Sequence, residues 1–271
     1  MNFSKKIYLI ILLTSFTLPL LAHTTIHTSQ KDKNGIRVKI LHFHPNKGTD
    51  LMGLKLGGKD EKEIKSLESV YFINKGKKRD LAPFLEKITL KNATEKAPEL
   101  AVTLNRTTGT RGGGDYIVVS KHTPHLKPWG VYIQLVTKSF ENIAGMITDW
   151  PNRVLDSLPE IIPLVSPTKI SVGDIFRAYV VDKTGKTISH AKINIEYLNY
   201  KIENDSILSN PLTDNEEMID QTIFTNSVGE FSFIPKRSGL WSFTLMDADA
   251  GAKINGKELK FNSLISIKVK R

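Results

Sequence analysis

Short apolar runs separated by turn residues follow one another along most of the chain. In residues 36–40 apolar and polar positions alternate with period two, which places Ile36, Val38 and Ile40 on one face of a strand. Similar runs predict further strands at 69–74, 88–90, 100–104, 115–120, 131–136, 175–181, 191–197, 221–225, 230–234, 239–245 and 264–269. The spacing of the later runs is that of a β-sandwich, and no helical pattern comes between them. The sequence therefore predicts an all-β protein.

Four prolines divide this series into two halves. They lie within residues 147–168, which we expect to form a linker because proline forbids a long helix there. The predicted organisation is two β-sandwich domains, an N-terminal β-rich domain at 23–146 and a C-terminal one at 169–271.

The first 22 residues have the pattern of a secretory signal peptide. Lys5 and Lys6 precede an apolar stretch at 7–21, and Ala22 offers a small residue for cleavage. The alternative is an uncleaved membrane anchor, which the shortness of the stretch disfavours, since a spanning helix needs about 20 apolar residues. We expect export to the periplasm and a mature chain that begins at His23.

Composition narrows the possible chemistry. The chain of 271 residues is 40% hydrophobic and 24% charged, as in ordinary globular proteins, and it has no cysteine. A disulfide scaffold, thiol catalysis and a cysteine-based zinc site are therefore excluded. The net charge of +10 would fall to +8 without the signal peptide. Its lysines are scattered without interleaved aromatic residues, so no nucleic-acid partner is expected.

Histidines gather near the predicted mature N-terminus. His23 would offer both its α-amine and its imidazole to one metal ion. His42 and His44, two residues apart on a strand, project to one face, and His27 could reach that face if the N-terminal segment pairs beside the strand. We predict a metal site drawn from His23, His44, His42 and His27. Nitrogen-rich ligation favours Ni(II), with Co(II) or Cu(II) as further possibilities.

The remaining histidines and a methionine are weaker candidates. His122 and His125 lie in a proline-rich loop, where they would complete the site, meet a transporter or pack on Trp129. Met52 is better explained as core filling than as a ligand, and His190 as a solvated turn residue.

Other active-site patterns are not supported. The glycines at 112–114 have no following helix or Lys-Ser/Thr, so they predict a hairpin turn and not a phosphate loop. Asp247 and Asp249 lack the further carboxylates that a calcium loop requires. No nucleophile elbow or placed pair of carboxylates is found. We predict that the protein is not an enzyme.

Several stretches together resemble a known family. They are His23, Ile40–Pro45 with Leu51–Met52, Gly114–Lys121, Lys127–Trp129, Ile161–Leu164, Gly173–Phe176, Phe224–Phe231, Ser238–Phe243 and Ser263–Val269. In this order they resemble the periplasmic accessory proteins of energy-coupling-factor nickel/cobalt uptake transporters, of NikK type. The resemblance implies a transthyretin- or Ig-like second domain and association with membrane metal-uptake components. The chain departs from the family pattern at His42, an added imidazole, and at Asn46 and Lys47, which put a carboxylate ligand there in doubt.

Three functions follow from these expectations. The first is a soluble periplasmic accessory protein that binds nickel, with cobalt as the alternative metal, and supports its uptake. The second is an N-terminal-histidine copper-binding protein or oxidative copper enzyme. The third is a metal-free adhesion or scaffold module.

Overall fold

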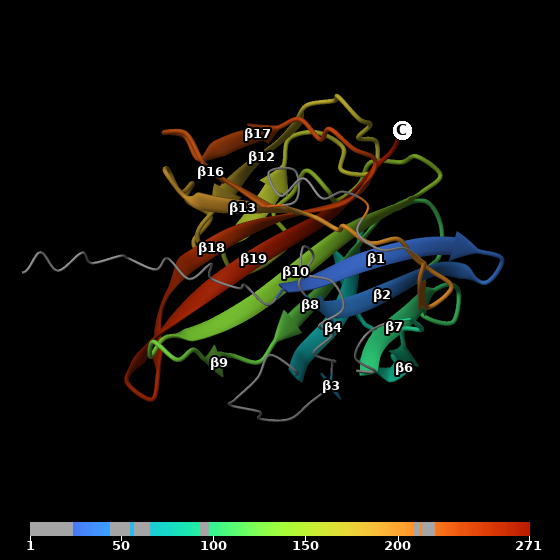
Figure 1. The fold of residues 1–271 in the computed structure, drawn as a ribbon, viewed down its shortest axis with the longest axis horizontal. Coiled ribbons are helices and arrows are strands. Elements are labelled where there is room, and N and C mark those ends of the chain that lie inside the picture. Colours follow the sequence, from blue (N-terminus) through green and yellow to red (C-terminus); the bar gives the residue numbers. More distant parts are fainter. Residues whose placement is uncertain (1–23, 44–54, 57–65, 93–97, 209–211, 213–219) are drawn as a thin grey trace, which may run out of the picture.

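The computed structural model describes residues 24–43, 55–56, 66–92, 98–208, 212 and 220–271. Within these ranges the chain is built from strands, and the one helical element is a 3-10 turn, η1 (Ala82–Phe84). The predicted all-β fold is confirmed, and it is of the sandwich type (Figure 1). The described part of the chain contains no helix that is long and apolar enough to cross a membrane.

A four-stranded antiparallel sheet lies on one side of the N-terminal half. In spatial order its strands are β1 (Thr24–Asp32), β2 (Gly35–Phe43), β7 (Pro98–Leu104) and β6 (Glu86–Thr89). Its inner face carries the alternating residues Ile36, Val38 and Ile40, which are buried against Val118 and Tyr116 of the neighbouring sheet. The predicted one-faced pattern of residues 36–40 is therefore confirmed.

A ten-stranded sheet runs through both halves of the molecule (Figure 1). Its main path runs in the order β16 (Asp220–Phe224), β13 (Lys192–Tyr197), β18 (Gly239–Ile254), β19 (Lys257–Val269), β10 (Tyr132–Ile143), β8 (Gly114–His122), β4 (Ser66–Asn74) and β3 (Lys55–Leu56). Two short strands attach to it, β5 (Lys77–Asp80) on β4 and β9 (His125–Leu126) on β10.

A three-stranded sheet covers the ten-stranded sheet in the C-terminal half. It consists of β11 (Glu160–Pro163), β12 (Phe176–Val181) and β17 (Glu230–Phe233). The core between the two sheets contains closely packed rings, among them Phe176 and Phe243 with centroids 4.6 Å apart. The proline-rich segment thus contributes a strand, β11, to the C-terminal sandwich.

Two backbone pairings are among the contacts that join the two halves. Strand β10 of the N-terminal half pairs in parallel with β19, with Tyr132 opposite Leu259. A small hairpin of the C-terminal half, β14 (Ile202–Glu203) and β15 (Ser206–Ile207), reaches across to the four-stranded sheet, where Lys91 pairs with Ser206. The domain boundaries stay a prediction, but the sheet itself is continuous across them.

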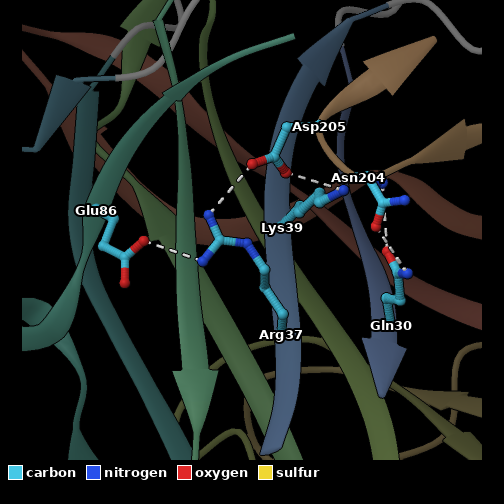
Figure 2. A network of polar contacts seen from close by, with 6 residues as sticks. All are labelled: Gln30, Arg37, Lys39, Glu86, Asn204 and Asp205. Carbon is cyan, nitrogen blue, oxygen red and sulfur yellow. Dashed lines mark hydrogen bonds and ion pairs between the residues drawn. The ribbon is translucent and has the colours of Figure 1, made fainter. Parts of the chain in front are cut away.

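Charged side chains secure this hairpin (Figure 2). Asp205 at its turn lies 3.0 Å from Nζ of Lys39 and 3.4 Å from Nη2 of Arg37, and the same guanidinium meets Glu86 at 3.0 Å. Lys39 is only 2% exposed, so the carboxylate of Asp205 compensates a charge that water cannot reach.

Candidate functional site

A histidine cluster lies where three strands come together at one end of the N-terminal half. Strand β1 begins there, and β2 and β8 end there. The antiparallel register places Thr25 opposite His42, and His122 is the last residue of β8. All three side chains are buried, with exposures of 1% for Thr25 and 0% for both histidines. Thr25, His42, His122 and Glu99 are called the histidine cluster below.

The hydroxyl of Thr25 connects the two imidazoles. Its Oγ1 lies 3.1 Å from Nδ1 of His42 and 2.6 Å from Nε2 of His122. A hydroxyl can donate one hydrogen bond and accept another, so it can serve both rings when one ring nitrogen carries a proton and the other does not. The ring centroids are 5.8 Å apart. Thr25 therefore sets the orientation of both rings.

Two polar side chains hold the backbone around these rings. Glu99 at the start of β7 is fully buried and accepts a hydrogen bond from the backbone N–H of His42 at 3.0 Å. Gln134 donates to the carbonyl of His122 at 2.7 Å and to Glu68 at 2.8 Å. The cluster thus contains a buried carboxylate, held to the backbone of His42, as well as two buried imidazoles.

His27 belongs to a different polar group. Its Nδ1 lies 3.0 Å from the hydroxyl of Ser139 in β10, and its Nε2 lies 2.8 Å from that of Ser120 in β8. Burial lowers the pKa of His27 from 6.5 to about 3, so the ring is neutral at physiological pH. Both ring nitrogens are used to join β1 to the large sheet.

The structure bears on the predicted metal ligands as follows. His23 and His44 lie outside the described residues, as does Met52. The N-terminal segment does pair beside the strand, which was the condition for His27 to approach His42, yet its ring is engaged by serines. The ring of His122 lies beside that of His42, and whether it completes a metal site stays a prediction. Among the described residues alone, no group of three histidine or acidic side chains converges as a metal site.

The two remaining histidine candidates, His125 and His190, lie outside the histidine cluster. His125 is buried in β9 opposite Ile133, whereas Trp129 is 57% exposed. His190 is an exposed turn residue with φ of 53°, as predicted.

Sequence reasoning missed Thr25 and Glu99. A threonine in a polar strand carries no local pattern that reveals its partners, and Glu99 stands beside the apolar run of β7 as an ordinary flanking charge. One sequence feature did point to Thr25. Side chains alternate between the two faces of a strand, so Thr25 lies on the same face of β1 as His27 and Ser29.

The comparison with protein families places the chain. A family model described as a domain of unknown function (DUF4198) matches residues 20–248, which include the histidine cluster and end within β18. The chain belongs to the DUF4198 family. Membership is consistent with a secreted accessory protein, and the family description names no activity.

No curated protein matches this DUF4198 chain. Two solved structures are similar over 90% of it. The adhesin InvE of Yersinia pseudotuberculosis is 10% identical, with 58% of that chain covered and a TM-score of 0.23. The E. coli alpha-2-macroglobulin is 13% identical, with 16% of that chain covered and a TM-score of 0.24. The DUF4198 chain thus spans less than two thirds of either protein.

Proposed function

We propose that this DUF4198 protein is a periplasmic accessory protein that binds Ni(II), or Co(II), as cargo and supports its uptake by a membrane transporter. The observation that carries the proposal is the pair of buried imidazoles of His42 and His122, oriented by Thr25 at the end of the four-stranded sheet.

Chain connectivity supports a larger ligand set. His23 is bonded to Thr24 and His44 to Phe43, and Thr24 and Phe43 are opposite each other in the β1–β2 ladder. Both additional histidines are therefore next in sequence to residues of this ladder. A site built from His23, with its α-amine after cleavage, His44, His42 and His122 would be rich in nitrogen, which suits Ni(II). Since the ring nitrogens of His27 are engaged by serines, we leave His27 out of this set.

The pair His42 and His122 is suited to hold a metal for a structural reason. A metal-binding imidazole is normally fixed by a hydrogen bond at its other ring nitrogen, and here Thr25 makes that bond to both rings. Imidazole ligands must be deprotonated to bind a metal, so binding at this pair would release any proton held at the coordinating nitrogen.

The test is calorimetric titration of the purified mature protein with Ni(II), Co(II), Cu(II) and Zn(II), after mass spectrometry of its N-terminus. His42→Gln and His122→Gln should each weaken Ni(II) binding by about 10–100-fold, with His190→Gln as the control that leaves it unchanged. Thermal unfolding of the metal-free variants checks that they fold.

Two results contradict the proposal. Equal Ni(II) affinity of the wild type and both cluster variants would remove its basis. Tight Cu(II) binding with ascorbate-driven oxygen consumption would instead support an oxidative copper enzyme.

A further inference from the structure

A second feature of the molecule is a cavity of about 770 Å³ on the other side of β1 and β2 from the histidine cluster. Its walls come from β1, from the segment around β14, and from the facing ends of β18 and β19. The docked hairpin shown in Figure 2 forms one side of it. This cavity is called the basic pocket below. Cavities of this size hold small organic molecules.

The pocket is strongly cationic. Six basic side chains line it, Lys39, Lys201, Lys236, Arg237, Lys268 and Arg271, together with a single acidic side chain, Glu203. Lys39 is paired with Asp205 at 3.0 Å and Lys201 with Glu203 at 2.9 Å. The other four cations make no ion pair of 4 Å or less with any described residue.

Two further carboxyl groups lie close to the pocket, that of Asp205, which is paired with Lys39, and that of Glu141. Glu141 of β10 is hydrogen-bonded to Ser29 and interacts with the charge of Lys268, while burial raises its pKa. It does not line the cavity. The excess of positive charge therefore remains, and a cleft lined by one sign of charge concentrates ligands of the opposite sign.

The pocket wall is rigid and partly apolar. The hydroxyl of Tyr197 donates to the carbonyl of Ser238 at 3.0 Å, and its ring lies so close to Gly239 that a Cβ there would be 2.8 Å from it. Arg237 donates from Nη1 to the carbonyl of Leu212 at 3.0 Å, which fixes its guanidinium. Side chains held in place before binding reduce the entropy that a ligand must overcome.

Apolar side chains complete the lining. Leu198, Ile202, Leu240 and Val269 contribute to it, so the cations surround an apolar surface. A simple inorganic anion would leave this surface in contact with water. A ligand with an apolar or aromatic body would cover it and would gain the free energy of its burial.

We propose that the basic pocket binds a small organic polyanion, a molecule with two or more carboxylate or phosphate groups on an apolar body. The cations at positions 236, 237, 268 and 271 meet its charged groups, and the half-buried side chains of Tyr200, Ile202 and Leu240 meet its body. This inference is independent of the metal-binding proposal, because no residue of the histidine cluster lines the pocket.

The experiment uses the full mature chain and two probes, benzene-1,3,5-tricarboxylate and 1,6-hexanediol bisphosphate. Binding is measured by calorimetry and by chemical-shift changes at low salt and at physiological salt. The pocket variant is Lys236→Glu/Lys268→Glu, since both side chains are exposed and tolerate change. The matched control, Lys186→Glu/Lys257→Glu, changes the net charge equally at exposed positions outside the pocket, each directly after a turn.

We expect at least one probe to bind, and the pocket variant to weaken it about tenfold or more while the control weakens it less than about twofold. The stronger of the two probes identifies the charged group as carboxylate or phosphate. Equal losses in both variants would show non-specific attraction and overturn the proposal, as would a dissociation constant weaker than about 1 mM for both probes. Citrate binding as tightly as the aromatic tricarboxylate would overturn the assignment of an apolar body.

Discussion

Protonation of His27 should limit the stability of the fold below neutral pH. Its ring is 2% exposed, and the groups that face it are the hydroxyls of Ser120 and Ser139, with Ser266 accepting from its backbone N–H at 3.4 Å. No carboxylate is among these partners to stabilise an imidazolium. The unfolded chain binds a proton near pH 6.5, and the folded chain only near pH 3.

The sign and size of the effect follow from this difference. Between these two values the unfolded state holds more protons than the folded state, so stability rises with pH in that window and is lost as the pH falls through it. For a pKa of 6.5 unfolded and about 3 folded, lowering the pH from about 7.5 to about 5 costs about 2 kcal/mol. In thermal unfolding this corresponds to a shift of about 4–8 °C.

The measurement is urea unfolding at a series of pH values in the presence of a chelator, for the wild type, His27→Gln and the exposed control His190→Gln. The amide of glutamine can still bond to a serine hydroxyl but does not titrate in this range. Between about pH 7.5 and about pH 5, the free energy of unfolding should fall by about 2 kcal/mol less in His27→Gln than in the wild type. In His190→Gln it should fall as much as in the wild type. Parallel curves for the wild type and His27→Gln would refute the reasoning, because His27 would then titrate alike in both states.

Three further experiments test charged side chains that are buried or hold the backbone. Lys138 and Glu160 form an ion pair with both side chains 0% exposed, so Lys138→Met should lower the free energy of unfolding in urea by about 3–5 kcal/mol. Adding Glu160→Leu should recover part of this loss, and a double variant no more stable than Lys138→Met would contradict the prediction. Asp205→Ala leaves the buried ammonium of Lys39 without its carboxylate and should cost about 1–3 kcal/mol, with faster hydrogen exchange in the β14–β15 hairpin than elsewhere. Asp149→Ala removes the acceptor of two backbone N–H groups in the β4–β5 turn and should cost about 1–2 kcal/mol; unchanged stability would show that water replaces it fully.

The alternation of apolar and polar residues in the sequence predicted most strands, but it did not predict a strand whose buried face is polar. The apolar runs at 36–40, 115–120 and 239–245 lie inside β2, β8 and β18, because their buried faces are made of aliphatic and aromatic side chains. Strand β1 buries Thr25 and His27 instead, so hydrophobic alternation could not reveal it. The parallel pairing of β10 with β19 joins segments more than 100 residues apart, and no local pattern contains it.

The polar face of β1 also explains why the sequence did not predict that His42 and His122 lie together. His122 is 80 positions from His42, and only the stacking of the four-stranded sheet on β8 brings their rings together. The hydroxyl of Thr137 in β10 donates a hydrogen bond to the backbone carbonyl of Thr25 at 2.7 Å. Buried polar groups are costly unless each finds a partner, and a one-residue slip of β1 would turn Thr25 and His27 away from theirs. The polar contacts that orient His42 and His122 therefore also fix the register of β1, so a change that loosens β1 should impair both the fold and the cluster.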